Sequence, residues 1–197
     1  EDANQDDSEE LSAEDASRYR AIAARCNYLQ PDRPEIQYAV KECCRRMARP
    51  TQRALEMLKR IGRYLRCKPR LVWRYDWQAP VDVLDMCSDS NWAGCRRSRK
   101  SSSGGTLSLG NHLIKSYSKR QSLVARSSGE AELYAIVRAS TEALGVSTLL
   151  LDFGLAGVKA SLSVDASAAI GIAQRSGLNK LRHAEVDVLW LQEQQAR

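Results

Sequence analysis

The sequence is poor in the residues that build zinc sites, disulfide frameworks and membrane spans. Its 197 residues include only two histidines, His112 and His183, and six cysteines that form no CxxC pair. Because a structural zinc ion needs a full set of suitably spaced Cys and His ligands, a zinc site is not expected. No apolar run approaches the roughly 20 residues of a membrane helix, and no basic-then-apolar leader opens the chain. We therefore expect an intracellular protein of the cytoplasm or nucleus, neither secreted nor bound to a membrane, whose thiols are reduced and mostly buried.

What the chain does contain is an uneven distribution of charge. The formal net charge is +6, yet residues 1–17 carry eight acidic groups and no basic one. Residues 18–75 carry 16 basic and four acidic groups, whereas residues 76–197 carry 14 and 12. The excess of Lys and Arg in the middle segment favours a polyanionic partner such as nucleic acid, with a solvated helix face as the alternative. We expect residues 1–11 to form a disordered acidic tail.

The first half of the chain has the hydrophobic periodicity of helices. Residues 12–15 (SAED) resemble a capping box, and apolar residues follow at helical spacing. Breaks at 31–34 (PDRP) and 50–51 (PT) separate two further amphipathic helices. These patterns predict a helical basic region over residues 12–78.

A period of two replaces the helical period near the end of this region. Residues 71–77 (LVWRYDW) alternate in character, which predicts a strand. Trp73, Tyr75 and Trp77 are interpreted as side chains packed in the core of that strand, with stacking on nucleic-acid bases as the alternative.

The second half predicts a mixed sheet with helices packed on it. The expected strands are 81–89, 105–109, 113–117 and 161–164, and the expected helices are 127–155, 166–175 and 185–196. Gly110 and Asn111 join the second and third strands as a hairpin turn. This order predicts an α/β fold in a domain over residues 79–197, and by itself it names no function.

Three carboxylates stand where strands end or a helix begins. Asp89 and Asp165 each follow an apolar strand, and Glu132 lies one turn into the long helix. If the three converge, hard oxygen ligands of this kind suit Mg²⁺ or Mn²⁺. Two such ions about 4 Å apart can support phosphodiester hydrolysis. The alternative is that the aspartates are turn residues and that the glutamate stabilises its helix dipole.

Five short segments in order make the pattern more specific. They are residues 88–94 (SDSNWAG), 99–104 (RKSSSG), 127–135 (SSGEAELYA), 164–170 (VDASAAI) and 180–186 (KLRHAEV). Together they closely resemble the ribonuclease H domain of copia-type retrotransposon Pol polyproteins. Residues 19–65 are similar to the connection between the reverse transcriptase and that domain, so the resemblance covers about residues 12–195.

The resemblance implies a ribonuclease H-like fold and cleavage of the RNA strand of RNA/DNA hybrids during reverse transcription. The remainder of the reverse transcriptase polyprotein is then a partner. Asp89, Glu132 and Asp165 match the catalytic, metal-binding positions, so Asp89 should bridge two Mg²⁺ or Mn²⁺ ions and the other two should bind one each. A non-catalytic nucleic-acid-binding remnant of such an element is the alternative function.

The chain departs from the family pattern near its end. By the family's spacing, the last strand of the fold and a fourth carboxylate lie beyond Arg197. We therefore expect the last strand to be lacking, and this span to bind metal weakly and cleave poorly. Glu185 or Asp187 could substitute as a ligand, although Glu185 more often caps a helix at this place. His183 either assists product release or caps the same helix.

Basic residues flank the predicted site. A loop beside Asp89 carries Arg96, Arg97, Arg99 and Lys100, and the hairpin is followed by Lys119 and Arg120. These side chains are expected to hold the hybrid through its phosphates, while 2′-hydroxyls distinguish the RNA strand.

Overall fold

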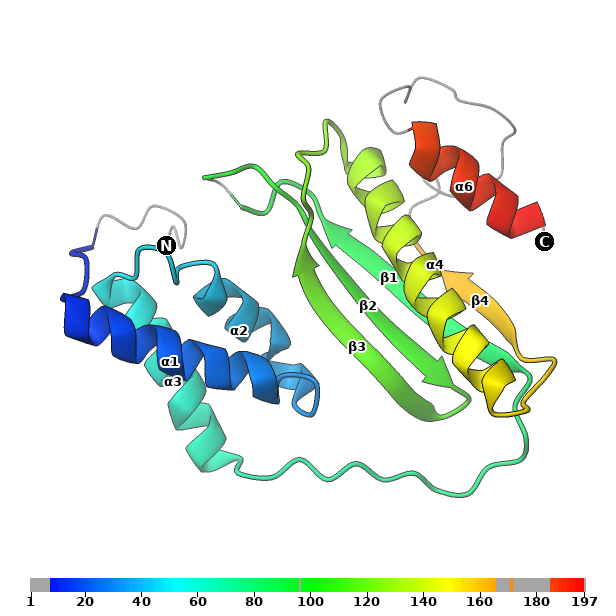
Figure 1. Ribbon diagram of the computed structural model, residues 1–197, viewed down its shortest axis with the longest axis horizontal. Helices are drawn as coiled ribbons and strands as arrows, with labels where there is room; N and C mark the ends of the chain where they lie inside the picture. Colours follow the sequence, from blue (N-terminus) through cyan, green and yellow to red (C-terminus); the bar gives the residue numbers. More distant parts are fainter. Residues whose placement is uncertain (1–7, 96, 166–170, 172–184, 197) are drawn as a thin grey trace. The chain divides into compact units, whose positions relative to one another are not determined.

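The computed structural model shows a mixed α/β protein whose contacts divide it into two compact units (Figure 1). The described residues are 8–95, 97–165, 171 and 185–196. The N-terminal unit comprises Glu1–Arg74 with Tyr117–Lys119, and the C-terminal unit comprises Tyr75–Ser116 with Arg120–Arg197. The division after Arg74 falls close to the boundary expected at residue 78. Among the described helices, none has the length and apolar content needed to cross a membrane.

The N-terminal unit is built from helices. They are α1 (Ala13–Leu29), the short 3₁₀ helix η1 (Pro34–Ile36), α2 (Gln37–Cys44) and α3 (Gln52–Cys67). The helix starts follow the predicted caps: Ser12 Oγ accepts from Asp15 N at 3.2 Å, and Thr51 Oγ1 accepts from Ala54 N at 3.3 Å. Pro34 stands in the first turn of η1. Local sequence therefore determines where these helices begin.

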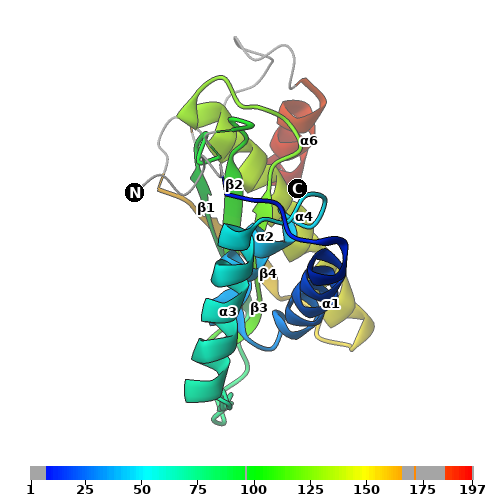
Figure 2. The ribbon, with the colours of Figure 1, turned by 90° about the vertical axis from the view of Figure 1, so that its left-hand side faces the viewer.

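The apolar stripes of these helices form one core. Helix α2 packs against both α1 and α3 (Figures 1 and 2). The buried side chains are Leu11, Ala16, Tyr19, Ala23, Cys26, Ile36, Val40, Cys43, Ala54, Leu58 and Ile61. Tyr19, although buried, keeps its hydroxyl satisfied by donating to the Cys43 carbonyl at 2.7 Å. The helical periodicity thus identified most of this core from the sequence.

Residues 9–11, which were predicted to belong to a disordered acidic tail, are ordered. Leu11 N donates to Pro50 O and Gln52 N donates to Glu9 O, each at 3.0 Å, and the Leu11 side chain is buried. Backbone pairing and the burial of one apolar side chain order residues 9–11 despite their neighbours' charge. The residues before Ser8 lie outside the described structure.

The prediction of a strand over residues 71–77 is wrong. No strand is assigned to this segment, and the chain runs extended from α3 to β1 (Val83–Asn91) (Figure 1). Trp73, Tyr75 and Trp77 are 40%, 57% and 90% exposed, so these aromatic residues are not packed in the core of a sheet. Alternation predicts a strand only where a neighbouring strand supplies hydrogen bonds, and no described strand does so here.

The C-terminal unit contains a four-stranded mixed sheet, apart from Tyr117–Lys119 of its β3 strand, which are grouped with the N-terminal unit. Its strands are β1 (Val83–Asn91), β2 (Ser102–Leu109), β3 (His112–Arg120) and β4 (Lys159–Ser163), in the order β3-β2-β1-β4. Strand β1 is antiparallel to β2 and parallel to β4. This arrangement confirms the predicted α/β class and the hairpin around Gly110, which adopts a φ of 59°.

Two described helices complete this unit. They are α4 (Ser128–Asp152) and α6 (Glu185–Ala196), and α4 packs across β1 and β2 (Figure 1). The buried apolar side chains include Leu84, Met86, Leu107, Leu133, Ile136, Val188 and Leu191. Apart from residue 171, the helix predicted over residues 166–175 falls outside the described structure, as do the side chains of His183 and Glu185.

Candidate metal centre

The register of the parallel strands places two aspartates side by side. Strand partners run from Val83 and Lys159 to Cys87 and Ser163, and partners are always 76 positions apart. Asp89 and Asp165 have the same separation, two residues beyond the last pair. Because side chains alternate along a strand, positions two residues further on share the same face. The two carboxylates therefore meet at the carboxyl end of the β1–β4 pair.

The start of α4 supplies the third carboxylate. Ser127 Oγ accepts from Glu130 N at 3.2 Å, and Glu130 Oε2 accepts from Arg126 N at 2.9 Å. These bonds form a cap of the kind that satisfies the free N–H groups of a helix start. Tyr134 donates to the other oxygen of Glu130, whose side chain is buried. Glu130 therefore holds the helix start, while Glu132 is left for the site.

Asp89, Glu132 and Asp165 converge. Each offers one carboxylate oxygen, and these oxygens all lie within 4.8 Å of one another. In the part of the chain that the structure describes, no other group of three Asp, Glu, His or Cys side chains comes together in this way. Asp187, considered above as a substitute ligand, is not a member of the group. The convergence anticipated from strand ends and a crossing helix is thus found in the structure.

Glu132 is the most buried of the three carboxylates. Its Oε1 accepts from Ser90 Oγ at 2.7 Å and from Ser90 N at 3.2 Å. Its Oε2 is buried and has no hydrogen-bond partner among the described residues. Burial raises the pKa of Glu132, and the negative charges of Asp89 and Asp165 add to the rise, although the Ser90 hydrogen bonds act in the opposite direction.

This arrangement fits a hard divalent cation. An unpaired buried carboxylate oxygen costs free energy unless a donor or a cation satisfies it. Three carboxylates also repel one another at this separation unless positive charge lies between them. All the converging ligands are oxygens, as Mg²⁺ and Mn²⁺ prefer. Asp89, Glu132 and Asp165 are therefore suited to hold such ions.

The loop between β1 and β2 carries part of the predicted basic set. Ser101 Oγ accepts from Ala93 N at 3.0 Å, and Lys100 Nζ donates to Ser122 O at 2.5 Å. Arg97 and Arg99 have exposed side chains. Because β1 and β2 pair up to the ends next to this loop, the exposed guanidinium groups belong to the same end of the sheet as Asp89.

The other predicted nucleic-acid-binding residues are Lys119, Arg120 and Arg96. Lys119 and Arg120, at the end of β3, are exposed. Arg96 lies outside the described residues.

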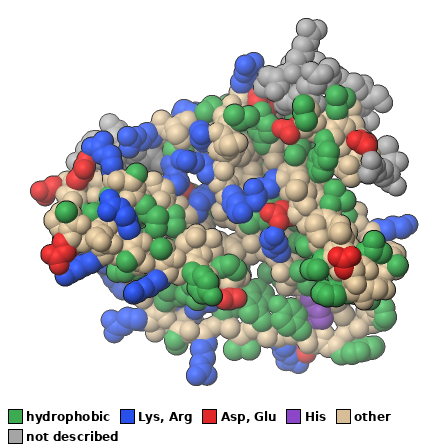
Figure 3. Space-filling model, in the orientation of Figure 1, with side chains coloured by type: hydrophobic (Ala, Val, Ile, Leu, Met, Phe, Trp, Pro, Cys, Tyr) green, Lys and Arg blue, Asp and Glu red, His purple; other side chains and the backbone are tan. Residues whose placement is uncertain are grey.

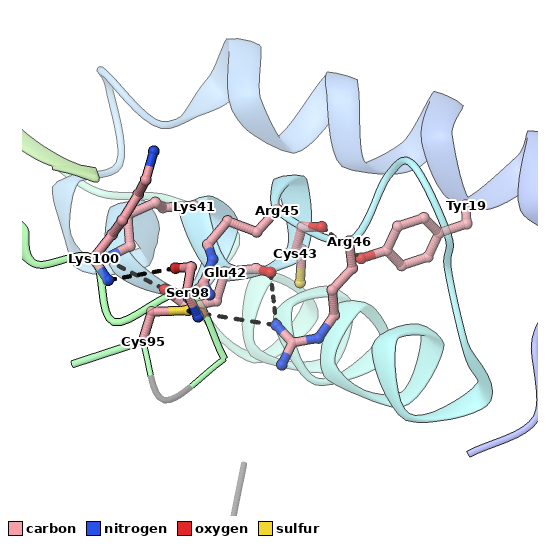
Figure 4. A network of polar contacts seen from close by, with 9 residues as sticks. All are labelled: Tyr19, Lys41, Glu42, Cys43, Arg45, Arg46, Cys95, Ser98 and Lys100. Atoms are coloured by element: carbon pink, nitrogen blue, oxygen red, sulfur yellow. Dashed lines mark hydrogen bonds and ion pairs between the residues drawn. The ribbon is translucent and has the colours of Figure 1, made fainter. Parts of the chain in front are cut away.

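Part of the positive charge of the N-terminal unit forms ion pairs with Glu42 of the same unit. Figure 4 shows Glu42 beside Lys41, Arg45 and Arg46. Glu42 Oε2 lies 2.6 Å from Arg45 Nη1 and 3.7 Å from Arg46 Nη1, and Oε1 lies 3.4 Å from Lys41 Nζ. On the face drawn in Figure 3, Lys and Arg side chains are spread over this unit rather than gathered into one patch. The net charge of the segment therefore overstates the charge free to meet a polyanion.

Ser90 is the residue that sequence reasoning missed. Its position next to Asp89 placed it within a recognised segment, and the alternation along β1 puts its side chain on the face opposite that of Asp89. The sequence carried no signal that this face meets Glu132, because that contact depends on how α4 lies over the sheet.

Comparison with known proteins relates the chain to retroelement sequences. No family model matches it. An uncharacterized mitochondrial protein of Arabidopsis thaliana is 37% identical over 128 residues, which are 65% of this chain and 53% of that protein. The retrovirus-related Pol polyprotein from transposon RE1 of the same plant is 36% identical over 141 residues, which are 72% of this chain and 10% of the polyprotein. The chain thus spans about half of the first relative and a tenth of the second.

One shorter relative is covered almost completely. A secreted RxLR effector protein of Plasmopara viticola is 32% identical over 124 residues, which are 63% of this chain and 87% of that protein. Identity at that level over most of a protein shows common ancestry. The homologous Pol polyproteins connect this group of sequences to copia-type retrotransposons.

Proposed function

Because the chain belongs to a family of sequences homologous to copia-type retrotransposon Pol polyproteins, we propose that it is a ribonuclease H-like domain that hydrolyses the RNA strand of RNA/DNA hybrids. The observation that carries the proposal is the convergence of Asp89, Glu132 and Asp165. The mixed sheet supports it, because the β1–β4 pair and the start of α4 bring these residues to one end of the sheet. The buried Glu132 Oε2, which has no hydrogen-bond partner among the described residues, adds to the support.

The carboxylates are proposed to hold two divalent cations. By the resemblance, Asp89, Glu132 and Asp165 would hold these ions. When bound, Mg²⁺ or Mn²⁺ neutralises the phosphodiester and supplies an activated water for hydrolysis. The protein's own contribution is to fix its ligands before substrate arrives: the strand register sets the two aspartates, and the cap at Ser127 sets the helix that carries Glu132.

The substrate is proposed to lie against the loop between β1 and β2. Arg97 and Arg99 are exposed there and contact phosphates without reading base sequence. Neutralised phosphates release counterions, so affinity for the hybrid should fall steeply with salt. The RNA strand is distinguished by its 2′-hydroxyl groups.

Asp89→Asn tests this function. The substitution keeps the size of the side chain and removes the charge that binds the cations. The weak cleavage of a labelled RNA/DNA hybrid that is expected of this span in Mg²⁺ should therefore fall to background, while hybrid binding is retained. Asp85→Asn is the matched control, because Asp85 is an exposed aspartate of the same strand outside the cluster. If the unmodified chain binds the hybrid and never cleaves it, the domain is a non-catalytic nucleic-acid-binding remnant. Equal cleavage by Asp89→Asn and the unmodified chain would show that another site carries the reaction.

A further inference from the structure

We propose that Ser90 is a positioning residue that holds one oxygen of Glu132 and leaves the other oxygen to bind a divalent cation. The inference rests on the proposed function, because it requires that the three carboxylates take such a cation. It assigns a role to a side chain that is neither a ligand nor a phosphate contact.

The hydrogen bonds at Glu132 are distributed unequally between its two oxygens. Ser90 directs both its hydroxyl, at 2.7 Å, and its backbone N–H, at 3.2 Å, to Glu132 Oε1. Glu132 Oε2 receives no hydrogen bond from the described residues and is buried. The Glu132 side chain is only 8% exposed. Its Oε1 accepts two hydrogen bonds and its Oε2 accepts none from the described residues, so the side chain is held with Oε2 available to a ligand.

The same backbone N–H also contacts the first aspartate. Ser90 N lies 2.8 Å from Asp89 Oδ1, so one N–H is shared between the carboxylates of two proposed ligands. Ser90 therefore fixes Glu132 relative to Asp89 and not merely relative to its own helix. A rotation of the glutamate carboxylate would break both hydrogen bonds that Ser90 donates to it.

The position follows from the alternation along β1. Leu84, Met86 and Ser88 are buried on one face, and Ser90 continues that face toward α4. Asp89 alternates with these positions and is exposed. Consecutive residues of one strand thus supply a ligand and the hydroxyl that orients the ligand from a different element.

The consequence is a Glu132 that binds through one oxygen. A carboxylate that turns freely about its last bond can offer either oxygen, or both, to a cation. With Oε1 occupied, only Oε2 is presented, and the ordering cost is met before the cation arrives. Removal of partners that orient metal ligands typically lowers metal affinity by 10–100-fold.

Mn²⁺ binding by the full chain tests this role without relying on cleavage. The free Mn²⁺ signal in electron paramagnetic resonance gives the Kd directly. We expect Ser90→Ala to raise the Kd for Mn²⁺ about 10-fold. Ser88→Ala is the matched control, because it removes another buried hydroxyl of β1, whose bond goes to Gly104 O at 3.5 Å, and it should leave the Kd unchanged.

A second pair of variants separates the hydroxyl from packing. Ser90→Thr and Ser90→Val have nearly the same shape, both suit a strand, and only the first keeps the donor. Ser90→Thr should bind Mn²⁺ much as the unmodified chain does, and Ser90→Val should bind it about 10-fold more weakly. Equal affinity of the two would overturn the role of Ser90, whatever the behaviour of Ser90→Ala.

The outcomes also separate this inference from the proposed function. If Asp89→Asn abolishes Mn²⁺ binding while Ser90→Ala and Ser90→Val leave it unchanged, the metal centre stands and Ser90 does not position it. If the unmodified chain binds no Mn²⁺, or binds it regardless of Asp89→Asn, the proposed metal centre is wrong and the role of Ser90 falls with it.

Discussion

The two units contain similarly buried glutamates in opposite surroundings. Glu42 of the N-terminal unit is 9% exposed and Glu132 of the C-terminal unit is 8% exposed. Glu42 is surrounded by the cations of Lys41, Arg45 and Arg46, whereas Glu132 faces the carboxylates of Asp89 and Asp165. A buried carboxylate with cationic partners is explained by the fold alone. One that faces other carboxylates contributes nothing to stability by itself, and it points to a cation that the fold serves to bind.

The largest difference between the two glutamates should appear in cation binding. Glu132→Gln removes a ligand charge, and we expect Mn²⁺ affinity to fall by at least about 100-fold, more than the loss expected for an orienting partner alone. Glu42→Gln should leave the affinity unchanged. Titration of each variant with Mn²⁺ measures both, and equal losses would show that the carboxylate cluster is not the binding site.

The free energy of unfolding should also separate the same two variants. Glu42→Gln leaves three cations without their counter-charge in a largely buried setting, so the free energy of unfolding should fall by about 3 kcal/mol. Glu132→Gln relieves repulsion between like charges, so without divalent cations it should be as stable as the unmodified chain or more so. Urea denaturation in EDTA gives both values. A destabilised Glu132→Gln would mean that the cluster is held by structural contacts.

The two units should also differ in their share of hybrid binding. Replacing Arg97 and Arg99 with alanine removes exposed charges beside the carboxylates, and we expect about 10-fold weaker binding at low salt, with a smaller salt dependence. Arg60→Ala with Arg66→Ala, two exposed positions on α3, is the matched pair in the N-terminal unit. Fluorescence anisotropy at several salt concentrations compares them. A larger effect from the α3 pair would move the main phosphate contacts to the N-terminal unit.

The smallest expected effect is a pH dependence that belongs to Glu132. Its pKa is raised in the folded protein, so the folded state holds a proton that the unfolded chain has already released. The resulting stabilisation is fully present below the ordinary pKa of 4.5 and is lost as pH rises through the higher folded value. The difference in unfolding free energy between the unmodified chain and Glu132→Gln should therefore change with pH above 4.5 in EDTA. Saturating Mg²⁺ should abolish this trend, and an unchanged difference across that range would contradict a raised pKa.

Much of the fold could be predicted because its signals are local. Helix starts near Ser12, Thr51 and Ser127 were predicted from local patterns, and the side chain of each of these residues accepts an N-cap hydrogen bond. The hairpin turn at Gly110 was predicted for the same reason, since glycine tolerates its positive φ. The strand prediction for residues 71–77 failed because alternation shows only that a segment could form a strand. A strand also needs a neighbouring strand to pair with, and the local sequence does not specify one.

The sequence by itself determined which residue types are present for the proposed chemistry and where each lies within its own element. Asp89 and Asp165 follow apolar strands, and Glu132 lies in the first turns of a capped helix, because helix caps and strand alternation depend on residues a few positions apart. Only the tertiary structure decided that the three meet, that Oε2 of Glu132 stays without a hydrogen bond, and that Ser90 holds Oε1. These contacts join residues 33 or more positions apart, and they depend on a parallel register and on how a helix packs over it, which no local pattern encodes.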